Sequence, residues 1–145
     1  MMKRCPNAIA MLCGMHPNTG PYGQVKFYQK ENAVLISINI QGLPATETGF
    51  FGFHIHEGDN CGGPDFSGTG SHYNPDKTPH PLHAGDLPPL IRSNGGAHQC
   101  VSTDRFTVSE IIGRTVVIHD RPDDFHTQPA GNAGTKIACG VICRV

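Results

Sequence analysis

The strict alternation of residues 33–41, AVLISINIQ, most constrains what this chain can fold into. Successive side chains of a β-strand point to opposite faces, so one face of this segment carries only apolar residues. Those residues are Val34, Ile36, Ile38 and Ile40, while Ser37 and Asn39 lie on the other face. The pattern predicts a strand with one face in the core and one toward solvent, which is typical of antiparallel sheets.

Further short runs of the same kind follow one another along the chain. Residues 23–30 alternate as well and pair with 33–41 as a predicted hairpin across a polar turn. The other predicted strands are residues 8–12, 49–56, 87–92, 105–109, 115–119 and 136–145. With 18 Gly, 12 Pro and no convincing helix, the 145 residues predict one all-β domain, 1–145, an eight-stranded antiparallel sandwich or barrel.

Charge and hydropathy exclude several classes of partner. The formal net charge of -1 argues against binding to nucleic acid or to an anionic membrane surface, because both require a basic face. No segment reaches the roughly 20 apolar residues of a membrane helix, and no apolar run of signal-peptide length follows the basic start. We therefore expect a cytoplasmic protein, or one outside the cytoplasm if the chain is processed.

Residues 57–86 form a long segment without a strand pattern, and its side chains indicate a metal. A loop of this length in a compact domain is usually functional or disordered. It contains His72, His80 and His83, with Asp86 directly behind them. Three nitrogens and one carboxylate match a closed tetrahedral zinc site. The alternative is a histidine-rich polar loop that binds nothing.

A second group of histidines lies on predicted strands. His54 and His56 are two residues apart in GFHIH, so both side chains point to the same face. Alone, the pair is explained equally well by a metal site and by the alternative, which is two surface histidines or one histidine held in the core. His119 ends the apolar run TVVIH and supplies a third nitrogen. A site built from imidazole nitrogens favours copper, so the sequence predicts two sites for two different metals.

Five segments in one order resemble the copper/zinc superoxide dismutase family, and the similarity extends from about Asn7 to Val141. They are GFHIHEGDN, GSHYNP, HAGDL, GRTVVIHDRPDD and GNAGTKIACGVI. The resemblance implies a Greek-key sandwich or barrel of immunoglobulin-like type with a long metal-binding loop. Its implied cofactors are a copper ion and a zinc ion, and its implied substrate is the superoxide anion.

The resemblance also implies a role for each matching residue. His54, His56, His72 and His119 bind copper, while His72, His80, His83 and Asp86 bind zinc, so that His72 bridges the two metals. Asp123 links ligands of both metals through hydrogen bonds. Cys61 and Cys139 form a disulfide between the metal loop and the last strand. The remaining cysteines are predicted to be free, with a Cys5–Cys143 disulfide as the alternative.

The implied activity is disproportionation of superoxide to dioxygen and hydrogen peroxide. His72 acts as a proton donor, and Lys136 stands where the family places an arginine that attracts the anion. A lysine lacks the planar pair of donors that docks an anion in one orientation, so we expect a reduced rate.

The main alternative is a non-catalytic copper-binding or copper-delivery protein on the same fold, because fold alone does not establish activity. The resemblance also allows a homodimer, but the sequence does not determine the oligomeric state, because family dimers use different faces.

Overall fold

The computed structural model describes residues 4–145, so the first three residues of the predicted domain 1–145 lie outside it. Its strands are β1 (Ala8–Leu12), β2 (Tyr22–Gln29), β3 (Val34–Gln41), β4 (Phe50–Phe51), β5 (Phe53–His56), β6 (Leu90–Ile91), β7 (Ala97–Thr103), β8 (Thr115–His119) and β9 (Lys136–Arg144). A 3-10 helix, η1 (Pro64–Thr69), and a short α-helix, α1 (Val108–Ile111), complete the elements. The prediction of an all-β fold is confirmed.

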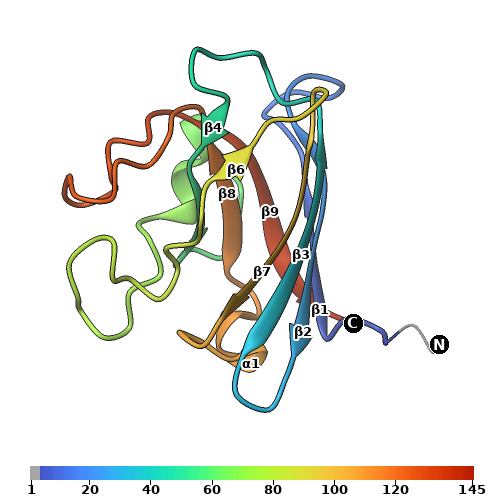
Figure 1. The fold of residues 1–145 in the computed structure, drawn as a ribbon, viewed down its shortest axis with the longest axis vertical. Coiled ribbons are helices and arrows are strands. Elements are labelled where there is room, and N and C mark those ends of the chain that lie inside the picture. The colour runs from blue at the N-terminus through green and yellow to red at the C-terminus, as the bar shows by residue number, and fades with distance from the viewer. Residues whose placement is uncertain (1–3) are drawn as a thin grey trace.

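Seven strands form one curled antiparallel sheet in the order β5-β8-β9-β1-β2-β3-β7 (Figure 1). The neighbours β5 and β8, β9 and β1, and β3 and β7 are not consecutive in the chain, so the order of strands in the sheet differs from their order in the sequence. A two-stranded sheet of β4 and β6 lies at one end of the curl. Since Gly52 alone separates β4 from β5, the two can be counted as one interrupted strand, which agrees with the predicted eight strands.

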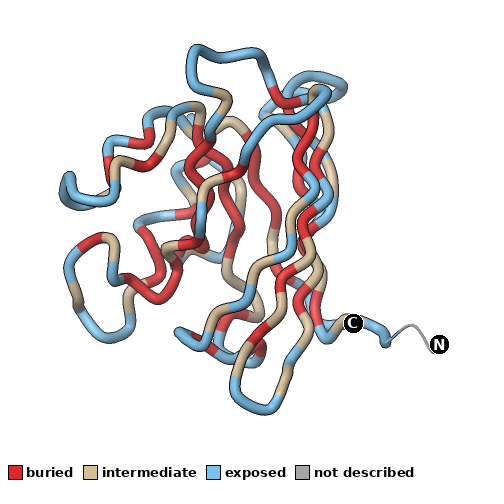
Figure 2. The backbone as a smooth tube through the Cα atoms, in the orientation of Figure 1, coloured by how far each residue is buried: buried red, intermediate tan, exposed pale blue. Residues whose placement is uncertain are grey.

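The alternating pattern of β3 has the predicted consequence. Val25 of β2 pairs with Ile38 of β3, and the apolar face of β3 is buried along its whole length. The buried apolar residues of β1, β2, β3, β5, β8 and β9 form a single cluster, so the core lies inside the curl. Figure 2 shows this cluster as buried stretches along the strands, while the connecting loops are mainly exposed.

The predicted strand at residues 105–109 is wrong. The strand in this region is β7, which ends at Thr103, and a helical turn begins after Thr107. The Glu110 carboxylate accepts hydrogen bonds from the backbone N–H and the hydroxyl of Thr107, at 2.6 and 2.8 Å. This Thr-x-x-Glu arrangement is a capping box, which starts a helix rather than a strand. The expectation of no helix is therefore also wrong for α1 and η1.

Two other predicted strands are shorter than expected. The segment 87–92 contributes only β6, since Pro88 and Pro89 have no N–H to donate to a sheet. The segment 49–56 breaks at Gly52, whose N–H donates to the Arg121 carbonyl oxygen at 2.8 Å. Its carbonyl oxygen accepts from the N–H of His119 at 2.8 Å. These bonds tie Gly52 to the end of β8.

Two long loops project from the same side of the sheet (Figure 1). One follows β5 and contains η1, and the other connects β8 to β9. Among the described residues, no helix is long and apolar enough to span a membrane.

Candidate metal centre

Strands β5 and β8 place three histidines together. His54 and His56 alternate with Phe53 and Ile55, which face the core, so the two imidazoles share the opposite face. Because His54 pairs with Val117 in register, His119 lies just beyond, at the end of β8. All three histidines are buried. Burial requires that something cover the histidine face of β5.

The long loop after β5 provides that cover by returning along the strand. Isolated bridges join His56 to His72 and His54 to Asp86. The Tyr73 N–H donates to the Ile55 carbonyl oxygen at 2.8 Å, and the Ile55 N–H donates to the Gly85 carbonyl oxygen at 2.9 Å. These backbone bonds fix His72 and Asp86 beside the two strand histidines.

One ring nitrogen of each strand histidine donates to an oxygen that can only accept. His54 Nε2 donates to Asp123 Oδ2 at 2.8 Å. His56 Nδ1 donates to the carbonyl oxygen of Gly70 at 2.8 Å, and His119 Nδ1 to that of Gly134 at 3.3 Å. A neutral imidazole has one donor and one acceptor nitrogen, so the other nitrogen of each ring carries a free lone pair.

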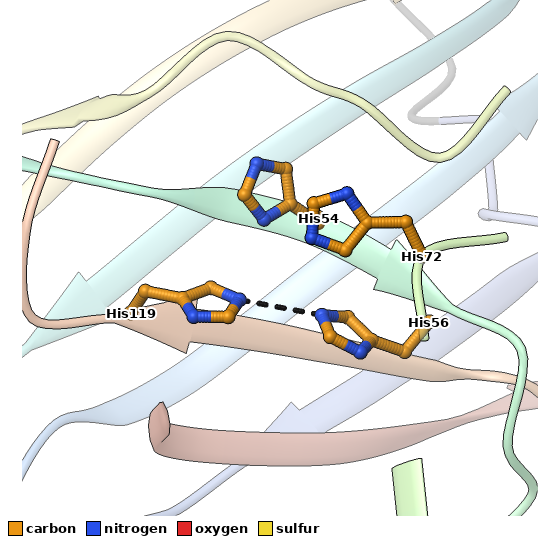
Figure 3. Close-up of side chains that lie close together, drawn as sticks. All are labelled: His54, His56, His72 and His119. Carbon is orange, nitrogen blue, oxygen red and sulfur yellow. Dashed lines mark hydrogen bonds between the residues drawn. The ribbon is translucent and has the colours of Figure 1, made fainter. Parts of the chain in front are cut away.

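Those free nitrogens converge. His56 Nε2 and His119 Nε2 face each other at 3.3 Å (Figure 3). His54 Nδ1 and His72 Nε2 are buried without a hydrogen-bond partner, and the two rings lie 4.0 Å apart between centroids. Four lone pairs directed at one buried place repel one another unless a cation lies between them. The four nitrogens therefore fit a copper ion.

A second set of donors shares His72. His72 Nδ1 lies 2.7 Å from Asp86 Oδ1 and 3.4 Å from His83 Nδ1. His80 Nδ1 lies 2.9 Å from Asp86 Oδ2 but makes no hydrogen bond with it. Since both atoms are hydrogen-bond acceptors, their lone pairs repel each other at this distance unless a cation lies between them. Three nitrogens and one carboxylate fit zinc.

Asp123 connects the two sets. Its Oδ2 accepts from His54 Nε2 and its Oδ1 accepts from His80 Nε2, at 2.8 and 2.7 Å. The Phe125 N–H also donates to Oδ1, at 2.7 Å. Because one carboxylate holds a histidine of each set, the two sets are fixed relative to each other.

The surroundings keep the histidines of the copper set neutral. Burial lowers the pKa of His54, and the hydrogen bond to Asp123 offsets this only in part. Burial also lowers the pKa of His56 well below its usual value and that of His119 to about 3. Neutral imidazole is the form that binds a metal.

The carboxylates are kept ionised. Burial alone would raise the pKa of Asp123, but the hydrogen bonds from His54, His80 and the Phe125 N–H lower it further than burial raises it. Burial would also raise the pKa of Asp86, but the hydrogen bond from His72, together with the neighbouring histidines, lowers it by more. Both groups therefore carry the negative charge that a cation site needs.

Comparison with known proteins agrees with this geometry. The family model described as Copper/zinc superoxide dismutase (SODC) matches residues 21–142. The chain is 35% identical over 135 residues to Superoxide dismutase [Cu-Zn] 2 of Aquifex aeolicus, covering 83% of this chain and 78% of the relative. It is 39% identical over 154 residues to the Extracellular superoxide dismutase [Cu-Zn] of Drosophila melanogaster, covering 93% and 83%.

The chain belongs to the copper/zinc superoxide dismutase family. Two clusters of candidate ligands, each with its donor atoms within 4.8 Å of one another, contain the residues predicted for copper and for zinc. They are His54, His56, His72 and His119 in one, and His72, His80, His83 and Asp86 in the other. His72 belongs to both, as a bridging ligand of this family must.

The cysteines and three further histidines lie outside both clusters. The Cys61–Cys139 disulfide is confirmed, with 5.9 Å between the Cα atoms. Cys5, Cys13, Cys100 and Cys143 are free and exposed, so the alternative Cys5–Cys143 disulfide does not form. His16, His98 and His126 lie outside both clusters and on the surface.

Lys136, at the start of β9, lies beside the copper set. Its Nζ donates to Thr69 Oγ1 at 2.7 Å and to the Gly70 carbonyl oxygen at 3.3 Å. The same carbonyl oxygen accepts from His56. The positive charge of Lys136 contributes, after burial, to the lowered pKa values of His56 and His119.

Sequence reasoning missed the carbonyl groups that orient the ligands. Gly70 and Gly134 hold His56 and His119 through backbone oxygens, which every residue has. No side-chain pattern could have identified them, because only the folded loops bring these carbonyl groups to the histidines.

Proposed function

We propose that this chain catalyses the disproportionation of superoxide. Two superoxide anions and two protons give one dioxygen and one hydrogen peroxide. The observation that carries the proposal is the pair of buried donor sets that share His72. A protein that only stored copper would not need a second, carboxylate-containing site joined to the first.

A bound copper ion would supply the one-electron chemistry, since it alternates between two oxidation states, whereas zinc has no accessible redox change. The chain itself holds the imidazoles of His54, His56 and His119 neutral. Asp123 and the carbonyl oxygens of Gly70 and Gly134 fix which nitrogen of each ring is free. Each of these rings therefore presents a defined nitrogen to a metal before the metal binds.

His72 is proposed as the proton donor. Its Nδ1 is engaged with Asp86 Oδ1, while Nε2 is buried and has no hydrogen-bond partner in the protein. A proton taken up at Nε2 therefore has no acceptor in the chain and can pass to a basic substrate anion nearby. That is general acid catalysis by an imidazole.

Lys136 is proposed to attract the anion. Its ammonium is held by Thr69 and Gly70, on the loop that also orients His56. An ammonium attracts superoxide as a point charge but does not present the paired, planar donors of a guanidinium. We therefore propose a working enzyme with a lower rate than an arginine at this position would give.

Copper and zinc loading followed by measurement of superoxide loss tests the proposal. The loaded protein should remove superoxide faster than buffer, with stoichiometric release of peroxide. His119→Ala, which deletes one nitrogen of the copper set, should abolish the gain. A loaded protein that holds copper but is no faster than buffer would instead identify the copper-binding or copper-delivery alternative.

We also propose that the protein forms a homodimer and is located in the cytoplasm. Analytical ultracentrifugation tests the first, and cell fractionation tests the second.

A further inference from the structure

A side chain of the loop between β8 and β9 holds the backbone of a zinc-set histidine. The amide of Gln128 makes two reciprocal hydrogen bonds with His80, which lies 48 residues earlier. The His80 N–H donates to Gln128 Oε1 at 2.9 Å, and Gln128 Nε2 donates to the His80 carbonyl oxygen at 2.7 Å. The backbone of His80 is thereby fixed to a loop that contains no metal ligand.

The same loop also holds the imidazole ring of His80. Asp123 Oδ1 accepts from His80 Nε2 at 2.7 Å. With its backbone and its outer ring nitrogen both tied to residues 123–128, the side chain has little freedom to rotate. The remaining nitrogen, Nδ1, is buried without a hydrogen-bond partner and points toward Asp86 Oδ2, 2.9 Å away.

We propose that Gln128 is a positioning residue for the zinc site. It acts through His80, by setting where Nδ1 lies before the metal binds. The inference rests on the zinc site of the proposed function. It adds to that site a residue of the loop between β8 and β9, which contains no zinc ligand. Groups that orient a metal ligand without touching the metal typically change affinity 10- to 100-fold when lost.

The chemistry of the side chain explains why glutamine suits this position. An amide offers one acceptor and two donors, so it can pair with the N–H and the carbonyl group of one residue at once. A methionine has a similar length but can form neither bond at comparable strength. Gln128→Met therefore removes both hydrogen bonds to His80, together with a longer one from Gln128 Nε2 to the His126 carbonyl oxygen at 3.2 Å, while keeping most of the volume.

Gln99 offers a matched control. Its amide also bonds one backbone N–H and one carbonyl group, here of two different residues, accepting from the Ile91 N–H at 2.8 Å and donating to the Pro89 carbonyl oxygen at 3.2 Å. Neither partner is a metal ligand. Gln99→Met thus has the same chemical change and a similar loss of hydrogen bonds, away from His80.

Zinc affinity, measured on the full chain by competition with a chromophoric chelator, tests the inference. Gln128→Met should raise the zinc dissociation constant about tenfold, and Gln99→Met should leave it within twofold of the unmodified protein. Cobalt(II) bound in place of zinc should show a changed visible spectrum only in Gln128→Met. This spectrum reports the geometry of the ligands and does not depend on activity.

Three results would overturn the inference, and they have different meanings. If Gln128→Met kept the zinc affinity and the cobalt spectrum of the unmodified protein, the hydrogen bonds of Gln128 would not position His80. Equal weakening in both variants would assign the effect to general loss of stability. Failure of the unmodified protein to bind zinc would refute the zinc site of the proposed function as well.

Discussion

Each histidine of the copper set that lies on a strand has one ring nitrogen bonded to an oxygen, and this bond decides which nitrogen is free. His54 uses Asp123 for this purpose, whereas His56 and His119 use backbone carbonyl groups. The carboxylate also reaches His80, so one residue orients ligands in both sets. Substitution of a residue that orients a ligand, such as Asp123, should therefore lower the affinity for metal even though that residue does not bind it.

If Lys136 attracts the anion as proposed, the activity should be sensitive to alkaline pH. Burial lowers the pKa of its ammonium below the usual 10.5. As pH rises through that pKa, the lysine loses the charge proposed to attract superoxide, so the rate should fall. A guanidinium stays protonated throughout this range, so Lys136→Arg should keep its rate to higher pH.

Pulse radiolysis of both proteins between pH 7 and 11 measures this effect. Near pH 7 the arginine variant should also be faster, since its fork can dock the anion in one orientation. An unchanged or lower rate in Lys136→Arg at neutral pH would contradict the role given to Lys136.

Gly131 should be required for the zinc site. It has φ +69, and a Cβ there would collide with Asp123 Oδ1 and lie 2.6 Å from His80 Nε2. Gly131→Ala should separate these two groups and weaken zinc binding at least tenfold, in addition to about 1–3 kcal/mol of backbone strain.

Gly49→Ala is the control for that strain, because Gly49 has φ +73 with nothing within 4 Å of the added Cβ. Urea unfolding of the metal-free variants and chelator competition separate the two effects. Similar zinc affinity in both alanine variants would show that crowding at Gly131 is unimportant.

At the scale of elements, the metal centre depends on how loops are attached to the sheet. The loop after β5 is bound to β5 by backbone bonds and to β9 by the Cys61–Cys139 disulfide. Gly70 lies in the same loop, nine residues after Cys61. Its carbonyl oxygen contacts both His56 and Lys136. The disulfide therefore holds a segment that contacts a copper ligand, His56, and the ammonium of Lys136.

Loss of the disulfide should lower both stability and activity. Cys61→Ser opens a loop with a sequence separation of 78 residues and should reduce the free energy of unfolding by about 2–4 kcal/mol. Superoxide removal should fall too, because Gly70 is no longer anchored. Cys100→Ser, at an exposed free thiol, is the control and should change neither value appreciably. Equal urea midpoints for the two variants would refute the expected contribution.

The strand that sequence analysis missed, β7, has no continuous apolar face. β7 carries the exposed residues His98, Cys100 and Ser102 on one face, so it shows no clear apolar alternation. It forms because its backbone pairs with β3 along seven residues, from Ala97 to Thr103. Long-range pairing of this kind leaves no local signal, whereas the helical start at Thr107 had one in its capping box.

On the scale of the whole molecule, the centre lies where two loops meet one edge of the curled sheet (Figure 1). The loops are mostly exposed, with buried stretches at the ligands (Figure 2). Little apolar burial stabilises them, so bound metals should supply much of their order. Metal-free protein should keep its core but hold the loops less firmly.

Removal of the metals should lower the melting temperature. A ligand present at 1,000 times its dissociation constant stabilises the folded state by about 4 kcal/mol, which for a chain of this size corresponds to a shift on the order of 10 °C. Calorimetry before and after dialysis against a chelator measures the change. A shift of less than a few degrees would mean that the loops are ordered without metal.

The sequence by itself determined the all-β class, the residues of both metal sets and their order along the chain. It could do so because strand alternation and histidine spacing are local properties, and because the five motifs resemble one family. The tertiary structure decided which nitrogen of each imidazole is free, how Asp123 links the two sets and where Lys136 places its charge. Those features depend on contacts between residues up to 69 positions apart, such as His54 and Asp123, and only folding brings them within hydrogen-bonding distance.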